Sequence, residues 1–419
     1  MIHITDKSNC CGCAACAQRC PKQCITMQLD DEGFYYPQVD ATKCIDCGLC
    51  EKVCPVINQE AARQPVQCIA ARGKQETVVK NSSSAGIFYL LAEKTIQNNG
   101  VVFGARFNDT WDVVHSWTDT IEGIKPFMSS KYVQSQISDS FKQAEAFLKE
   151  GRKVLFSGTP CQISGLKHYL RKPYDNLICI DVICHGAPSP GVWREYLKYE
   201  ISPKGRTNTV SSLLYSPLSE GDALRIKGIS FRDKRLGWKK YSFVLLTSQG
   251  DSRSEENSVS SSYKPIVQQK HYYNLYMKTF LANLSLRQSC FACPARKGKS
   301  GSDILLGDYW GIARYYPEFF DKNGVSMALA YTDKGKQLLA SLDLQTQVIK
   351  YSETCGNTNL EYDDPYPCGR DTFFEDFKLK GASAMKDYWK KNASNPIKVY
   401  GKALMYKMKM LFNNSSLIL

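Results

Sequence analysis

The first 55 residues contain the same cysteine pattern twice. The spacing C-x2-C-x2-C-x3-C-P occurs as Cys10, Cys13, Cys16, Cys20 and Pro21, and again 34 positions later as Cys44, Cys47, Cys50, Cys54 and Pro55. This is the spacing of loops that hold [4Fe–4S] clusters, in which the fourth cysteine of each run binds the cluster of the other run. Three thiolates on one tight loop reach three corners of a small cube, and the fourth corner is closed from across the fold.

This rule assigns the eight cysteines to two sites. The first cluster site consists of Cys10, Cys13, Cys16 and Cys54, and the second of Cys44, Cys47, Cys50 and Cys20. Zinc sites and disulfides are the alternatives, but zinc sites pair C-x2-C motifs and do not use three cysteines at x2 spacing before x3-C-P. Cys11 and Cys24 fall outside the pattern, and we expect them to be packing or spare thiols.

Composition indicates a globular protein with an excess of basic residues. Its 419 residues predict two or three domains, and 43% hydrophobic residues predict a substantial core. The net charge of +13 would fall to about +7 with three clusters at about −2 each. The remaining charge favours an acidic partner protein or a phosphorylated substrate. Nucleic-acid binding is not expected, because no binding motif accompanies the charge.

The beginning of the chain and its cysteine content predict a compartment. The sequence MIHITDKSNCC lacks an apolar signal region, and no stretch approaches 18 consecutive apolar residues, so we expect no transmembrane segment. Eighteen cysteines in cluster spacing without a signal peptide are typical of a reducing environment rather than of a secreted disulfide scaffold. We therefore expect a cytoplasmic protein.

Apolar patterning predicts a small domain followed by a larger one. Between the cysteine runs, residues 25–29 and 34–37 form a hairpin that joins the halves of a dicluster ferredoxin domain, residues 1–57. Residues 58–66 are polar and predict a linker. Residues 67–150 begin a mixed α/β domain. Its expected elements are a strand at 67–71, a helix at 86–95, paired strands at 100–107 and 113–117, and a helix between an N-cap at Ser138 and Gly151.

The domain continues over residues 151–345 with repeated strand–turn–helix units. Strands at 153–156 and 177–184 are each followed by a turn, at 157–162 and 185–190, and by a helix, at 163–170 and 191–199; residues 302–306 form a further buried strand. Such units predict a parallel sheet with helices on its faces. The expected fold is therefore α/β (α+β), a 2x[4Fe–4S] ferredoxin domain followed by a larger mixed-sheet, flavoprotein-like α/β domain.

Two segments are expected at the periphery. Residues 248–262 are polar and rich in serine, which predicts a loop or insertion. Residues 346–419 form a C-terminal extension that ends in a basic helix, with Tyr400, Leu404, Met408 and Leu411 on one face. Peripheral membrane contact through this helix is one interpretation. Docking on the protein's own body is the interpretation we favour.

Four cysteines beyond residue 67 predict a third cluster site. Cys161 and Cys184 lie at the carboxyl ends of predicted strands, which meet at one edge of a parallel sheet. Cys290 and Cys293 form a C-x2-C pair that can join them. The alternative is that isolated cysteines are ordinary buried hydrophobic residues. Cys68, Cys179, Cys355 and Cys368 have no visible partners in the sequence.

Several motifs of the larger domain resemble one family. They are SGTPCQI at 157–163, Cys184-His185-Gly186, Phe231-Arg232-Asp233-Lys234, Cys290-x2-Cys293, and Ser302-Asp303-Ile304 with Gly307-Asp308. Over roughly residues 67–345 the chain resembles the coenzyme F-420 hydrogenase/dehydrogenase beta-subunit family. The resemblance implies an iron–sulfur flavoprotein that binds FAD and passes electrons between clusters and an organic acceptor. Cys161, Cys184, Cys290 and Cys293 would then hold the cluster nearest to the flavin.

The resemblance also implies a flavin site. Ser82, Ser83, Ser84 and Gly86 precede a helix, where backbone N–H groups and hydroxyls can hold a pyrophosphate. Lys131 is a candidate to pair with a phosphate, and Ser157, Gly158 and Thr159 are further cofactor-binding candidates. The alternative for these positions is a capped helix start and a solvated lysine.

The expected activity is electron transfer from a reduced ferredoxin or partner subunit to a small acceptor, which is acidic or sugar-linked. Arg232 and Lys234, with Arg235, are candidates to hold its acidic groups, and His185 is a candidate proton donor. A solvated basic loop and a structural histidine are the alternatives. The rival functions are a non-catalytic electron-transfer subunit and a redox sensor.

Overall fold

The computed structural model describes residues 1–202, 215–248 and 263–392. The polar segment expected at 248–262 and the amphipathic face expected at 400–411 therefore lie almost wholly outside the described residues. The division into domains at residues 57, 67, 150 and 345 stays a prediction.

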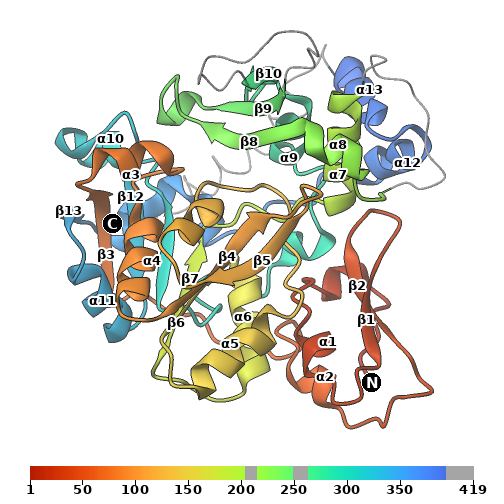
Figure 1. Ribbon diagram of the computed structural model, residues 1–419, viewed down its shortest axis with the longest axis horizontal. Coiled ribbons are helices and arrows are strands. Elements are labelled where there is room, and N and C mark those ends of the chain that lie inside the picture. Colours follow the sequence, from red (N-terminus) through yellow and green to blue (C-terminus); the bar gives the residue numbers. More distant parts are fainter. Residues whose placement is uncertain (203–214, 249–262, 393–419) are drawn as a thin grey trace, which may run out of the picture.

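Figure 1 shows the arrangement of the elements. The strands are β1 (Ile25–Leu29), β2 (Tyr35–Val39), β3 (Gln67–Gly73), β4 (Val101–Phe107), β5 (Val113–Thr118), β6 (Val154–Gly158), β7 (Leu177–Val182), β8 (Ile226–Asp233), β9 (Ser242–Ser248), β10 (Tyr263–Lys270), β11 (Ile304–Asp308), β12 (Ser326–Ala330) and β13 (Leu344–Val348). The helices are α1 (Ala15–Arg19), α2 (Leu49–Lys52), α3 (Glu76–Asn81), α4 (Ile87–Gln97), α5 (Ser140–Lys149), α6 (Pro160–Leu170), α7 (Pro190–Ile201), α8 (Glu220–Arg225), α9 (Leu275–Leu281), α10 (Ile312–Tyr315), α11 (Asp333–Ala340), α12 (Arg370–Lys380) and α13 (Ser383–Asn392). Among the described residues, no helix combines the length and apolarity needed to cross a lipid bilayer.

The centre of the molecule is an eight-stranded mixed sheet in the order β13-β3-β12-β11-β7-β6-β4-β5. The four strands β11, β7, β6 and β4 are parallel neighbours, whereas β5, β12 and β13 run antiparallel to theirs. The predicted α/β class with a mixed sheet is confirmed. Because parallel strands end at the same edge, the loops after β6, β7 and β11 lie together there.

Apolar side chains fix the layers around this sheet. One face packs against α5 and α6 through Phe141 and Ile163, and the other against α4 and α11 through Leu91 and Leu339. A second sheet, β10-β9-β8, packs with α7, α9 and α12 around an aromatic cluster that includes Trp193. The sequence patterns did not predict this second sheet.

The N-terminal module consists of α1, α2 and the hairpin β1–β2, which extends towards α7 in Figure 1. Gly33, at the tip of the hairpin, accepts a 3.1 Å hydrogen bond from the amide of Gly191, and the Ser189 hydroxyl donates to the Glu32 carbonyl at 2.6 Å. The residues between module and sheet are also held in place, because Arg63 donates to the carbonyls of Gly298 and Ser302. The module is therefore packed on the larger body.

Two helix starts differ from the expectation. The turn predicted at 157–162 is wrong in its second part, because Thr159 and Gln162 form a capping box and Pro160 occupies the first helical turn. Helix α6 thus begins three residues early and carries Cys161 in its first turn. The N-cap predicted at Ser138 is also wrong, because Asp139 takes that position and Ser138 adopts a left-handed conformation.

Candidate electron-transfer site

The two N-terminal cysteine loops repeat in backbone conformation as well as in spacing. Gly12 (φ 72°) and Ala14 (φ 58°) are left-handed in the first loop, and Asp46 (φ 48°) and Gly48 (φ 66°) take the equivalent positions in the second. Each loop is followed by a short helix, α1 or α2. The left-handed residues bend the chain tightly, so that cysteines three positions apart can face a common point.

The structure brings together the cysteines assigned to the first cluster site. The pKa of Cys16 is raised by burial and by the neighbouring Cys10 and Cys54 thiols. Cys11 lowers the pKa of Cys13, but burial together with Cys16 and Cys54 raises it overall. These four side chains come from two loops, because Cys54 follows α2. Their ligand role stays a prediction.

The cysteines of the second cluster site line one pocket. Cys20, Cys44, Cys47 and Cys50 surround it together with Cys24, whose sulfur lies 3.3 Å from that of Cys20. Cys47 is exposed. The second site therefore lies at the surface of the module, and Cys24, which we expected to be a spare thiol, belongs to its wall.

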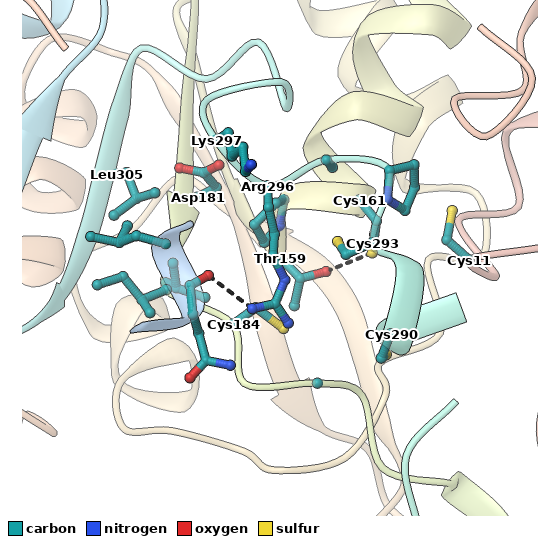
Figure 2. Close-up of a pocket in the computed structure, with 18 of the residues that line it drawn as sticks. Cys11, Thr159, Cys161, Asp181, Cys184, Cys290, Cys293, Arg296, Lys297 and Leu305 are labelled. Carbon is teal, nitrogen blue, oxygen red and sulfur yellow. Dashed lines mark hydrogen bonds between the residues drawn. The ribbon is translucent and has the colours of Figure 1, made fainter. Parts of the chain in front are cut away.

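The third set of cysteines converges at the carboxyl edge of the large sheet. Cys161 on α6, Cys184 after β7, and Cys290 and Cys293 around the 3-10 helix η4 (Gln288–Ala292) line one pocket. Figure 2 shows them around this pocket, with Cys11 on the adjacent loop of the N-terminal module. Pocket and cysteines thus combine elements that are more than 100 residues apart in the chain.

These thiols are held close together without disulfide bonds. The cysteines whose side chains are described are all free. Burial, together with the neighbouring Cys290 and Cys161, raises the pKa of Cys184, and burial raises the pKa of Cys290 to about 12. Iron binds thiolates, so that loading such a site releases protons. Within the described ranges no three His, Cys, Asp or Glu side chains close around a single metal ion, and a four-iron cubane holds its thiolates farther apart than a single ion does.

The first and third sites touch each other. The neighbouring Cys11 thiol raises the pKa of Cys161, and the neighbouring Cys13 thiol raises the pKa of Cys11 itself. A Cβ atom on Gly165 of α6 would lie 2.7 Å from the Cβ of Cys13. Cys11 therefore lies between one cysteine of each site, a position that its lack of spacing partners did not reveal.

Buried arginines lie beside the cysteines. Arg296 contacts Asp363 at 2.8 Å, and its pKa is raised, against the effect of burial, by Cys293 and Asp363. Arg287 donates to the carbonyl of Cys10 at 2.6 Å. Neither arginine was predicted from the sequence. The signal that could have found them is their position, three residues before Cys290 and three residues after Cys293.

The serine loop before α4 consists of Ser82, Ser83 and Ser84. Two of its hydroxyls are hydrogen-bonded within the described residues and the third is not. Ser83 accepts hydrogen bonds from the amide and hydroxyl of Ser130 at 2.6 and 2.9 Å, and Ser82 donates to the Val78 carbonyl. The buried Ser84 hydroxyl has no hydrogen-bond partner among the described residues. Gly86 begins the helix at φ 84°.

Lys131 lies next to this loop and is partly buried. Its ammonium donates to the carbonyls of Met128 at 2.9 Å and Ser129 at 3.2 Å, and burial lowers its pKa to about 7. Because no carboxylate compensates its charge in these contacts, the group is suited to receive an anion.

His115 on β5 connects Lys131 to the carboxyl end of β6. Its Nε2 lies 3.0 Å from the Ser157 carbonyl and its Nδ1 lies 2.9 Å from the Ser135 hydroxyl, while burial lowers its pKa to about 4. Lys131 contributes to this shift, which places it nearby. Thr159, two residues after Ser157, lies 3.3 Å from the sulfur of Cys161. Gly158 stands between them, so these three flavin candidates at the end of β6 lie next to the third site. No role for His115 was predicted from the sequence.

The three candidates for substrate contact have different surroundings. Lys234 donates to the carbonyls of Val79, Ser84 and Asn323 at 2.7 to 3.0 Å, and burial together with Arg232 lowers its pKa to about 8. It therefore holds the serine loop rather than pointing into a pocket. Arg235 is exposed and pairs with Asp233.

Arg232 is buried between the rings of Tyr241 and Trp310 and forms an ion pair with Asp308. Its Nε and Nη2 atoms have no hydrogen-bond partner among the described residues. His185 lies on the third-site side, 3.6 Å from Asp364 and edge-on to Phe280.

Two family models match the chain, one near its N-terminus and one in its larger domain. Residues 9–58 match the model of the 4Fe-4S dicluster domain, and residues 151–354 match that of the C terminus of the coenzyme F420 hydrogenase/dehydrogenase beta subunit. A 43-residue segment, 10% of the chain, is 49% identical to a 7Fe ferredoxin from Hydrogenibacillus schlegelii and spans 49% of that protein's length.

The fold comparison is distant. The chain matches a chain of the F420-reducing [NiFe] hydrogenase complex from Methanosarcina barkeri with a TM-score of 0.44 and 14% identity, over 80% of this chain and 95% of that chain. This level of likeness carries no argument about activity. On the family models, the chain joins an iron–sulfur dicluster module to a C-terminal domain of the coenzyme F420 hydrogenase/dehydrogenase beta-subunit family.

Proposed function

We propose that this protein is an iron–sulfur flavoprotein oxidoreductase. It would take electrons from a low-potential donor protein, a ferredoxin or a partner subunit, and deliver them through [4Fe–4S] clusters and FAD to a small organic acceptor. The observation that carries the proposal is the contiguity of the sites. Cys11 lies between the first and third cysteine sets, and Thr159, one of the flavin candidates, contacts Cys161 of the third set.

The order in which electrons would pass the three cluster sites is inferred from the exposure of their cysteines. Cys47 of the second set is exposed, whereas Cys13 of the first set is buried, and Cys161 of the third set lies at the sheet edge beyond Cys11. A donor protein that contacts the N-terminal module would therefore meet the second site first. This order supports a path in which electrons arrive at the module and leave at the edge of the large sheet.

The residues near the serine loop fit an anionic cofactor. The Ser84 hydroxyl, which lacks a partner among the described residues, the Lys131 ammonium and the start of α4 at Gly86 supply donors and positive charge for a pyrophosphate. Ser157 and Gly158 border the same region through His115. A bound flavin would accept single electrons from the clusters and would deliver a hydride to the acceptor.

The acceptor would lie near the unpaired atoms of Arg232. A carboxylate or phosphate could satisfy the Nε and Nη2 atoms that lack partners among the described residues. The rings of Phe280 and Tyr132, 4.8 Å apart, connect this region to His185. His185 is our candidate for proton donation there.

One observation favours a second candidate function, a non-catalytic electron-transfer subunit. Lys234 is fully used by backbone carbonyls and Arg232 already pairs with Asp308. Few of the candidate cations are then left to hold an acidic substrate. In this case a partner protein would take the electrons at the same sheet edge.

Composition analysis tests the proposal. We expect about 12 iron and 12 acid-labile sulfide and about one flavin per chain in protein purified without oxygen. About 8 iron without flavin would contradict both the third cluster and the flavin. If the cofactors are present, reduction of a small acceptor by the isolated, chemically reduced chain distinguishes the enzyme from the electron-transfer subunit.

A further inference from the structure

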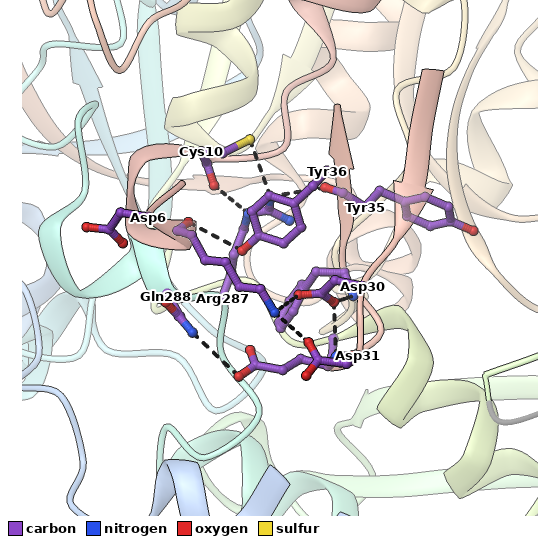
Figure 3. A network of polar contacts seen from close by, with 12 residues as sticks. Asp6, Cys10, Asp30, Asp31, Tyr35, Tyr36, Arg287 and Gln288 are labelled. Atoms are coloured by element: carbon purple, nitrogen blue, oxygen red, sulfur yellow. Dashed lines mark hydrogen bonds and ion pairs between the residues drawn. The ribbon is translucent and has the colours of Figure 1, made fainter. Parts of the chain in front are cut away.

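Arg287 is a fully buried cation in contact with the first cysteine loop. Its side chain is 1% exposed. It donates to the Cys10 carbonyl at 2.6 Å and to the Cys10 sulfur at 3.4 Å, and its Nη1 donates to Gln134 at 3.2 Å. Figure 3 shows it between Cys10 and the strand that carries Tyr35 and Tyr36. The Tyr36 ring lies 3.9 Å from the guanidinium carbon.

Arg287 differs from the other buried arginines nearby in its ion-pair partners. Arg194 pairs with Asp112 at 2.7 Å, and Arg370 pairs with Glu32 at 2.5 Å. Arg287 forms no ion pair with a carboxylate among the described residues. Burial lowers the pKa of Arg287, and the neighbouring side chains that raise it are Cys10, Tyr36 and Cys11 rather than a carboxylate. A buried charge without a counterion is costly, so that an anionic cluster at Cys10 would supply the missing partner.

The position of Arg287 connects two cysteine sites. It precedes η4, which carries Cys290, and its charge also acts on Cys161. A Cβ atom on Gly12 would lie 2.9 Å from its Nη1, so the first loop leaves no space between them. The guanidinium therefore lies at the junction of the first and third sites.

The geometry points to Arg287 as the residue that raises the reduction potential of the first cluster. A cationic hydrogen-bond donor at a ligand sulfur stabilises the reduced cluster, which carries one more negative charge than the oxidised one. Arg287 acts on the potential through Cys10 and is a positioning residue rather than a catalytic one. This inference rests on the proposed function, because it requires the cluster.

Redox titration of variants followed by EPR tests the inference. Arg287→Gln is expected to lower the reduction potential of the first cluster by at least about 59 mV, which corresponds to a tenfold change in its one-electron redox equilibrium. Arg287→Lys retains the charge and is expected to restore most of the potential. Gln134→Glu keeps Arg287 but places a carboxylate against it, and is expected to lower the potential as well.

Arg194→Gln is the matched control, because it removes an equally buried guanidinium that contacts the Tyr35 hydroxyl and pairs with Asp112 rather than with a thiol. It should leave the potential unchanged. The signal of the first cluster is the one altered in Cys13→Ser. Iron is measured on every sample, so absence of iron from the wild-type protein refutes the proposed function itself.

Unchanged potentials in an iron-loaded Arg287→Gln protein would overturn the inference. If that variant does not retain iron, Gln134→Glu decides, and an iron-loaded Gln134→Glu protein with the wild-type potential overturns it equally. A potential lowered in Arg194→Gln to the same extent would also overturn it, because the shift would then follow from general loosening.

Discussion

Lys131 combines a partly buried position with hydrogen bonds to neutral groups. Its ammonium bonds to two carbonyls, those of Met128 and Ser129. Burial lowers its pKa to about 7. An anion bound beside it would favour the charged form and raise that pKa. The protonation state of Lys131 is therefore linked to the binding of the proposed flavin.

We predict that flavin affinity depends on pH through Lys131. Below pH 7 the lysine is already charged and the affinity for FAD is at its maximum. Above pH 7 binding must take up a proton, so the affinity falls by up to tenfold per pH unit. Titrations of FAD with the protein at pH values from 6 to 9, followed by the quenching of flavin fluorescence, measure this affinity.

Two variants at position 131 serve as controls. Lys131→Arg should bind FAD with little pH dependence, because arginine stays charged, and Lys131→Met should bind weakly at every pH. A wild-type affinity that stays constant across this range would refute the role of Lys131.

At the scale of elements, α6 positions cysteines of two sites. The capping box of Thr159 and Gln162 starts the helix early enough to carry Cys161 in its first turn. One turn later, Gly165 packs directly against Cys13 of the N-terminal module. The helix therefore fixes the separation between the first and third sites.

Gly165→Ala is predicted to disturb the first cluster site. The new Cβ would lie 2.7 Å from the Cβ and 2.9 Å from the sulfur of Cys13. We expect the loss of about four of about twelve iron, measured by iron analysis and EPR. In a helix interior the same substitution without a clash would stabilise by up to about 1 kcal/mol.

The control for this variant is Gly221→Ala in α8, where a Cβ would meet nothing within 4 Å. It should retain the wild-type iron content. A Gly165→Ala protein with full iron and an unaltered EPR spectrum would show that the contact between α6 and Cys13 is not needed for the site.

At the scale of the whole molecule, a buried ion pair fastens the N-terminal module to the body. Arg370 of α12 is 0% exposed and binds both carboxylate oxygens of Glu32, at 3.0 and 2.5 Å. It also donates to the carbonyl of Leu286, next to Arg287. The pair thus connects the hairpin tip, the third-site loop and the C-terminal helices.

Breaking this pair is predicted to destabilise the protein strongly. Glu32→Gln leaves the buried Arg370 with only the exposed Asp371, 4.0 Å away, as a counterion, and removing the buried partner costs about 3–5 kcal/mol. Urea unfolding under anaerobic conditions, followed by circular dichroism, measures the change.

The double variant Glu32→Gln/Arg370→Met should be less destabilised than Glu32→Gln alone, because no unpaired charge remains. Strictly additive losses from the two single variants would mean that the two side chains do not stabilise each other.

The sequence predicted the parts of the fold that depend on local patterns. The hairpin and the strands β3, β4, β5 and β6 lie within a few residues of their expected positions, because alternation and turn residues are local signals. The start of α6 was misplaced because Pro160 was interpreted as part of a turn, although proline is favoured in a first helical turn. The sheet β8-β9-β10 was missed, because its pairing depends on packing against the aromatic cluster.

The iron–sulfur character of the N-terminal module could be predicted from the sequence alone, and the match of residues 9–58 to the 4Fe-4S dicluster domain agrees with it. Thiolates spaced C-x2-C-x2-C-x3-C-P specify iron–sulfur loops, because covalent geometry fixes which sulfurs a short loop can bring together. Only the tertiary structure decided the neighbours of these loops. Arg287 contacts Cys10 across 277 residues of sequence, and Cys11 lines the same pocket as Cys161 of a distant helix. Such contacts follow from how sheet, helices and module pack together, which no local spacing encodes.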